Sequence, residues 1–270
     1  MLILLPPSEG KAAPARGKPL DLDAMTMPEL REARAEVLDA LVTLCRPGSP
    51  DLPLESASAR HLATQTLGLG KTQSDEIDRN AALRTAPTAR AEQIYTGVLY
   101  EALDLPSLET AAKRRASTWV AITSGLFGLV RPHDRIPAYR LSGDVSLPGL
   151  GPVAAHWRGV REPAVLEAAG GGLILDLRST TYAGFWRPHA GVGGQVASVR
   201  VLHEVGGERK VVSHFNKATK GRLVRSLLTS GDHPASPADL VEALGDHGWH
   251  VEVERAGRTG TKLDVVVSDL

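Results

Sequence analysis

The sequence predicts an α/β protein in which helices flank a mixed β-sheet. Residues 2–5 form a continuous apolar run, and residues 119–123 and 173–177 are largely apolar; such runs are typical of strands buried on both faces of a sheet. The chain between the first and second runs has helical periodicity instead. We therefore expect a helical insertion over roughly residues 27–115, between the first strand and the rest of the sheet.

The remaining elements follow from helix periodicity, glycine turns and proline positions. Helices of the insertion are expected at about 26–44, at about 57–66, from 72, from 87, and from 106 to 115. After the strand at 173–177 we expect a hairpin formed by 196–203 and 210–215, a basic helix at 218–228, a helix after Pro237, and a closing strand pair at 249–254 and 263–267.

Length and composition indicate how many domains the chain forms and whether its net charge would attract a charged partner. A length of 270 residues with 42% hydrophobic residues fits one large domain covering 1–270. The 31 basic residues equal the 31 acidic ones, so no net charge attracts a polyanion. A nucleic-acid surface would need an uneven placement of charge, and residues 209–225 hold six bases and no acid.

Cysteine, histidine and the N-terminal run exclude several classes of protein. The single cysteine, Cys45, excludes a disulfide framework and a thiolate zinc site, and its apolar neighbours favour a buried thiol over a redox sensor. The nine histidines are scattered, so we expect no metal site and no cofactor. The apolar start is too short for a signal sequence or a membrane span, which predicts a cytoplasmic protein with no membrane partner.

One candidate phosphate site lies between two predicted helices of the insertion. Residues 67–71 follow the hydrophobic-Gly-hydrophobic-Gly pattern of a helix-hairpin-helix, with Gly68 and Gly70 for the turn and Lys71 for charge. Glycine amides and a helix N-terminus can hold a phosphate without reading sequence. A glycine that simply ends one helix before the next begins is an equally physical interpretation.

Other polar groups follow apolar strands or glycine turns. Because the carboxyl ends of parallel strands share one sheet edge, we expect Lys11, Arg140, Arg178 and Lys217 to line one cleft, with Glu9 as its acid. A buried Asp176–Arg178 ion pair and a solvated basic helix are the structural alternatives. The candidate phosphate ligands are Gly68, Gly70, Lys71, Arg131, Arg140, Lys217, Lys220, Arg222 and Arg225.

The segments together resemble the YaaA family of peroxide stress response proteins. The resemblance is carried by MLILLPPSEGK at 1–11, YTG at 95–97, SGLFGLVRP at 124–132, PAYR at 137–140 and VSHFNKATKGR at 212–222. It implies a compact YaaA-like α/β fold with a positively charged cleft. It also implies binding of double-stranded DNA through a helix-hairpin-helix, and a role in limiting iron-driven damage.

Two functions are consistent with the sequence. The first is a DNA-binding peroxide stress protein that holds the phosphate backbone in a basic cleft. The alternative is an enzyme acting on a nucleotide, a nucleobase or another small anion in the same cleft, with Glu9, Lys11, Arg178 and Lys217 as catalytic residues. A peroxide or iron sensor is disfavoured by the buried character of Cys45.

Overall fold

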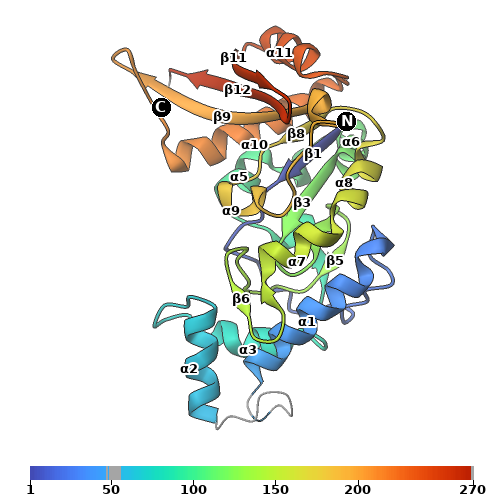
Figure 1. Ribbon diagram of the computed structural model, residues 1–270, viewed down its shortest axis with the longest axis vertical. Coiled ribbons are helices and arrows are strands. Elements are labelled where there is room, and N and C mark those ends of the chain that lie inside the picture. The colour runs from blue at the N-terminus through green and yellow to red at the C-terminus, as the bar shows by residue number, and fades with distance from the viewer. Residues whose placement is uncertain (47, 49–55, 269–270) are drawn as a thin grey trace.

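The computed structural model describes the chain except for residues 47, 49–55 and 269–270 (Figure 1). In this part the principal sheet has eight strands in the order β11-β12-β9-β8-β1-β3-β4, with β10 paired to β9. The α/β class and the mixed central sheet flanked by helices are therefore confirmed. The strands are β1 Leu2–Leu5, β3 Val120–Ser124, β4 Gly128–Val130, β8 Ile174–Asp176, β9 Val196–Val205, β10 Glu208–Lys210, β11 His250–Gly257 and β12 Gly260–Val267.

Helices and short ribbons surround this sheet. Between β1 and β3 the described chain forms α1 Arg31–Cys45, α2 Ser56–Thr66, α3 Asp75–Ala81, α4 Ala91–Ile94, α5 Val98–Leu103 and α6 Thr110–Trp119. After β4 come α7 Val153–Val160, α8 Glu162–Ala169, α9 Thr180–Ala183, α10 Ser213–Ser230 and α11 Pro237–Asp246. Two small ribbons pair β2 Ala89–Arg90 with β5 Arg135–Ile136, and β6 Ser146–Leu147 with β7 Gly151–Pro152. Helices α1, α2 and α3 gather at the end of the molecule opposite β11 and α11 (Figure 1).

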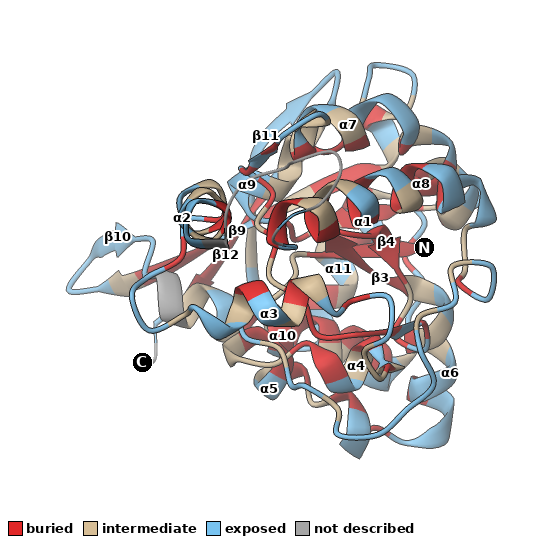
Figure 2. Ribbon diagram, turned by 90° about the horizontal axis from the view of Figure 1, so that it is seen from below, coloured by how far each residue is buried: buried red, intermediate tan, exposed pale blue. Residues whose placement is uncertain are grey.

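The centre of the sheet is parallel and fully buried. β1 pairs in parallel with β3 on one side and with β8 on the other, and β8 continues in parallel to β9. All four residues of β1 are completely buried, as the continuous apolar run predicts. Figure 2 shows the buried residues concentrated in the sheet and on the inner faces of the helices around it. The carboxyl ends of β1, β3 and β8 consequently meet at one edge.

The predicted hairpin at 196–203 and 210–215 differs from the structure in its second half. β10 ends at Lys210, and α10 begins at Ser213, so Asn216 and Lys217 lie on a helix rather than at the end of a strand. Val211 and Val212, which lie within the predicted second strand, are both exposed. An apolar dipeptide at a strand-to-helix junction is too short to distinguish these cases by periodicity.

The turn between β3 and β4 is held in place by side chains from two helices. The indole Nε1 of Trp157 donates to Gly125 O at 2.7 Å. Arg34, fully buried on α1, donates to Phe127 O at 3.1 Å and to Leu129 O at 2.8 Å. These bonds satisfy carbonyls that the tight turn leaves unpaired, and they fix the turn that follows Ser124.

None of the helices in the described ranges combines the length and the apolarity required to cross a lipid bilayer.

Replacing Gly128 with alanine should destabilise the protein through this turn. Gly128 has φ +70°, and a Cβ there would lie 2.6 Å from the Trp157 ring. The expected loss in the free energy of unfolding is about 2–4 kcal/mol, from backbone strain plus overpacking. Gly149, at φ +77° with open space where a Cβ would stand, is the matched control, and Gly149→Ala should cost only about 1 kcal/mol. If urea unfolding gave equal losses of stability for the two variants, the Trp157 ring would move away from the added methyl group without a cost in free energy.

Candidate functional site

The loop after β1 is pinned to the segment that follows α4. Lys11 forms an antiparallel bridge with Tyr95, and Ala12 N donates to Ile94 O at 2.9 Å. Ser8 Oγ accepts a hydrogen bond from Thr96 N at 3.0 Å. Two sequence motifs that lie far apart in the chain, at 1–11 and 95–97, are thereby placed side by side at the carboxyl edge of the sheet.

Lys11 places its ammonium group among aromatic rings and backbone carbonyls. Its Nζ donates to Ser8 O at 2.8 Å and lies 4.3 Å from the centroid of the Tyr139 ring, within cation–π distance. No carboxylate of a described residue forms an ion pair with it. Desolvation, reinforced by the nearby charge of Arg140, lowers the pKa of Lys11 to about 7. Near neutral pH the amine is therefore present in both its charged and its neutral forms.

A chain of hydroxyl groups runs beneath Lys11. Tyr139 Oη lies 2.9 Å from Tyr95 Oη and 2.7 Å from Ser124 Oγ, and Phe127 N donates to the same Ser124 Oγ at 2.9 Å. These side chains are buried, and burial raises the pKa of Tyr95 and of Tyr139. The hydroxyls are neutral at ordinary pH, so each can donate one hydrogen bond while accepting another.

Arg140 presents a guanidinium beside Lys11. Its Nη1 lies 3.5 Å from Glu9 Oε2; the Arg140 side chain is 17% exposed, whereas the Glu9 side chain is 86% exposed. The backbone of Arg140 is clamped by the fully buried Asn80 of α3, whose amide accepts from Arg140 N at 2.9 Å and donates to Arg140 O at 2.8 Å. The backbone of Arg140 is therefore held firmly, while its acidic partner Glu9 is largely exposed.

Asp176 and Arg178 form a buried ion pair at the end of β8. Arg178 donates to both carboxylate oxygens of Asp176, at 2.8 and 2.7 Å, and also to Trp186 O at 3.0 Å. Burial alone would raise the pKa of Asp176, but the charge and hydrogen bonds of Arg178 outweigh it, so the pKa lies below its usual value. The geometry matches the structural ion pair considered from the sequence, because every strong bond of Arg178 points into the protein.

Tyr182 interacts with residues of both charged groups. Its carbonyl accepts from Arg178 Nη1 at 3.1 Å, while burial, countered by hydrogen bonds from Gly143 and Ser142, raises the pKa of its hydroxyl to about 12. The charge of Glu9 also acts on this hydroxyl. Tyr182 is thus hydrogen-bonded to Arg178 through its carbonyl, while the charge of Glu9 reaches its hydroxyl.

The cations predicted for α10 divide into two kinds. Lys220 Nζ donates to Leu177 O at 3.1 Å, and burial lowers its pKa against the opposing effect of Asp176. Arg225 donates to Leu103 O at 2.9 Å and to Asp104 O at 2.8 Å. By contrast, Lys217 and Arg222 are exposed. Only these two of the four α10 cations are free to meet a partner without breaking contacts.

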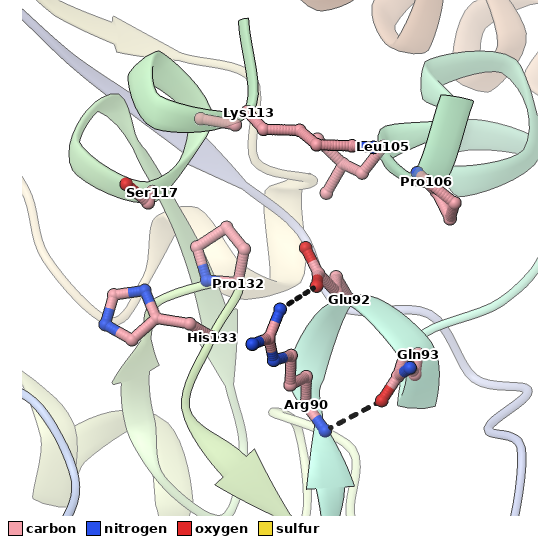
Figure 3. A pocket seen from close by; sticks show the side chains of 10 residues that line it. Arg90, Glu92, Gln93, Leu105, Pro106, Lys113, Ser117, Pro132 and His133 are labelled. Atoms are coloured by element: carbon pink, nitrogen blue, oxygen red, sulfur yellow. Dashed lines mark hydrogen bonds and ion pairs between the residues drawn. The ribbon is translucent and has the colours of Figure 1, made fainter. Parts of the chain in front are cut away.

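Arg131 lies away from the carboxyl edge. Its Nη1 donates to Thr118 O at 2.6 Å and to Val120 O at 3.0 Å, at the start of β3. A nearby hollow of about 280 Å³ is lined by Arg90, Glu92, Lys113 and His133 among others (Figure 3). Arg90 and Glu92 pair with each other across 3.4 Å there. This hollow lies beside the amino end of β3, so it does not belong to the Lys11 group.

The glycine pattern at 67–71 forms a helix C-cap. Gly68 has φ +61°, Gly68 N donates to Gln65 O, and Leu69 N donates to Thr64 O, which is the bond pattern of a Schellman motif at the end of α2. Gly70 N is occupied by Gln73 Oε1 at 2.8 Å. The following helix α3 carries Asp75, Glu76 and Asp78 in its first turn, which opposes a phosphate there. Lys71 is exposed beside this turn.

The structure adds residues to the site that received no role from the sequence. Tyr95 and Tyr139 stood within motifs of the family resemblance. Aromatic residues make up only 4% of the chain, so a tyrosine inside such a motif was the feature that could have indicated a role in the site. Ser124 also stood within a motif of the resemblance, whereas Asn80 carried no signal, because its hydrogen bonds to the distant backbone of Arg140 leave no periodic pattern. In the described ranges no three His, Cys, Asp or Glu side chains cluster as metal ligands would.

Comparison with known proteins gives one family. The family model described as peroxide stress protein YaaA matches residues 1–254. A UPF0246 protein of Streptomyces coelicolor is 51% identical over 272 residues, covering 100% of both chains. A UPF0246 protein of Corynebacterium efficiens is 40% identical over 269 residues, covering 98% of this chain and 100% of its own. One from Ruegeria is 31% identical over 260 residues, covering 94% and 95%.

Removing the Lys11 amine should stabilise the protein in a pH-dependent manner. The pKa of Lys11 is about 7 in the folded state, against 10.5 for an unperturbed lysine, so the unfolded chain binds more protons between these limits and stability rises with pH there. Lys11→Met should therefore raise the free energy of unfolding at about pH 6, and the gain should shrink as pH increases above 7. Lys18→Met, at an exposed lysine, is the control and should show no such trend. A pH-independent effect of Lys11→Met in chemical denaturation would contradict the lowered pKa.

Proposed function

The chain belongs to the YaaA family of peroxide stress proteins, and from that premise we propose that it acts as an enzyme on a small anionic substrate at the carboxyl edge of its sheet. The substrate class is a nucleotide, a nucleobase or another small anion. The reaction centre is the group formed by Lys11, Tyr139 and Arg140.

One observation carries this proposal. The Lys11 ammonium is desolvated, rests on the Tyr139 ring at 4.3 Å, and faces the cation Arg140 without an ion pair to a described carboxylate. Such an arrangement lowers stability, since burying an unpaired charge is unfavourable. Titratable groups with strongly perturbed pKa values gather at functional sites, because catalysis needs a group that changes protonation near neutral pH.

The surrounding residues supply the other requirements of a reaction centre. Arg140 can bind an anion through its guanidinium, and its backbone is fixed by Asn80. The Tyr139 and Ser124 hydroxyls can pass a proton within the buried layer. Asp176 and Arg178 hold the segment that carries Tyr182, so their contribution is to position rather than to react.

Anion binding tests this proposal directly. Adenosine monophosphate and oxamate, an unreactive carboxylate, serve as probes in calorimetric titrations of the intact protein. Arg140→Gln should weaken binding roughly tenfold or more, the effect expected when a charged hydrogen bond is lost. Arg200→Gln is the matched control. Arg200 also pairs with a carboxylate, that of Asp264, but it lies on β9 and is not part of the Lys11 group. Absence of binding by the wild type at millimolar concentration, or equal losses in both variants, would overturn the proposal.

A second candidate function, binding of double-stranded DNA, is favoured by the exposed cations of α10. Lys217 and Arg222 are exposed on a helix that begins at the carboxyl edge, and neither forms an ion pair with a described residue. Phosphate contacts from such residues would give sequence-independent affinity. Covering DNA in this manner would limit iron-driven damage during peroxide stress. Most other cations of the predicted surface are engaged in internal contacts, which makes this candidate the weaker of the two.

If the protein binds DNA, removing the exposed cations of α10 should reduce its affinity for DNA and the dependence of that affinity on salt. Lys217→Ala and Arg222→Ala should each weaken binding to unrelated duplexes by a similar factor, and each should reduce the slope of log K against log salt by about one unit. Lys262→Ala, at an exposed lysine on β12, should leave the slope unchanged. Fluorescence anisotropy at several salt concentrations measures these slopes. Unchanged affinity in both α10 variants at low salt would remove this helix from the DNA interface.

A further inference from the structure

The chemistry of the Lys11 group can be narrowed beyond anion binding. We propose that Lys11 is a nucleophile that forms an imine with a small carbonyl compound bearing a carboxylate, which Arg140 holds in place. This inference rests on the proposed function, because it uses the same site and names the class of its substrate.

The first support is the double activation of the amine. A lysine becomes nucleophilic when its ammonium is desolvated or when a second cation lies close to it. Lys11 has both features, since its Nζ sits 4.3 Å from the Tyr139 ring centroid and 5.7 Å from that of Tyr95, with Arg140 acting on its charge. The residue is half-buried, so part of its surface remains open to solvent.

The second support is the carboxylate that contacts the Arg140 guanidinium. Glu9 places a carboxylate 3.5 Å from Arg140 Nη1, although its own side chain is 86% exposed. A long contact made by an exposed side chain costs little to break. A carboxylate on the substrate could replace that of Glu9 and would bind more tightly if both its oxygens met the guanidinium. The contact therefore indicates the anion that suits this position.

The third support is a source of protons next to the amine. When the neutral amine attacks the carbonyl carbon, a C–N bond forms, and the carbonyl oxygen takes up a proton to give a carbinolamine. Loss of that oxygen as water then forms the C=N bond, with the two nitrogen protons leaving in the water molecule overall. No oxidant or reductant is consumed. The Tyr139 ring against which the amine packs carries a hydroxyl bonded to Ser124 at 2.7 Å, and we assign the movement of these protons to that hydroxyl.

Reductive trapping tests the inference on the intact protein. Glyoxylate with cyanoborohydride should convert Lys11 to its carboxymethyl derivative, located by peptide mass spectrometry. An ordinary exposed lysine has a pKa near ~10.4, so Lys11 should react at least about tenfold faster than exposed Lys18 at neutral pH. Because the pKa of Lys11 is about 7, its labelling rate should rise with pH and level off above that value.

Selectivity for the carboxylate gives the matched comparison. Glyoxylate should label Lys11 faster than acetaldehyde does in the wild type. Arg140→Gln should abolish this preference while acetaldehyde still labels Lys11, and Arg140→Lys should restore part of it. Circular dichroism confirms that the variants are folded.

The outcomes separate the inference from the proposed function. Labelling of Lys11 no faster than that of Lys18 would overturn the imine, and an equal response to both aldehydes would overturn the carboxylate-bearing substrate held by Arg140. If oxamate binding still depended on Arg140 in that case, the proposed function would stand without it. Preferential, Arg140-dependent labelling at Lys11 would support the imine.

Discussion

The parallel pairing of β1 with β3 and β8 is the constraint on which the rest of the structure depends. All three strands are short and buried, and their carboxyl ends meet at one edge. The chain leaving each strand therefore delivers a different chemical group to the same place: the loop with Lys11 after β1, Ser124 at the end of β3, and the Asp176–Arg178 pair after β8. No local preference of those loops would bring these groups together.

The inserted helices complete this edge rather than forming a separate body. Asn80 of α3 fixes the backbone of Arg140, and Tyr95, which follows α4, contributes to the hydroxyl chain. The charges of Glu76 and Arg79, also on α3, act on the Lys11 amine in opposite directions. The insertion thereby sets the electrostatic surroundings of a group that the sheet positions, and the cost of desolvating Lys11 is met by packing elsewhere in the fold.

The sequence predicted the fold class and the central strands because a short, continuous apolar run bounded by polar residues and turn signals is typical of a strand buried on both faces. Strand-end reasoning also predicted one cleft lined by Lys11, Arg140, Arg178 and Lys217 beside Glu9, and that shared cleft stays a prediction. Sequence reasoning failed at residues 211–215, which were predicted as a strand, because Val211 and Val212 are exposed and α10 begins at Ser213. It also could not separate charges available to a ligand from charges used internally. Lys217 and Lys220 are three residues apart on one helix, yet only Lys220 is bound to a backbone carbonyl, and that distinction depends on tertiary packing.

The position of β1 at the centre of the sheet has a consequence for synthesis of the protein. β1 is synthesised well before its partners β3 and β8, which begin at Val120 and Ile174. This fully apolar strand therefore has both edges unpaired until its partner strands have been synthesised. Pairings between strands so far apart in sequence also form slowly. During this interval the strand is a site for misassociation or for chaperone binding. The completed edge, and any chemistry it performs, can exist only after the segment around Arg178 has emerged.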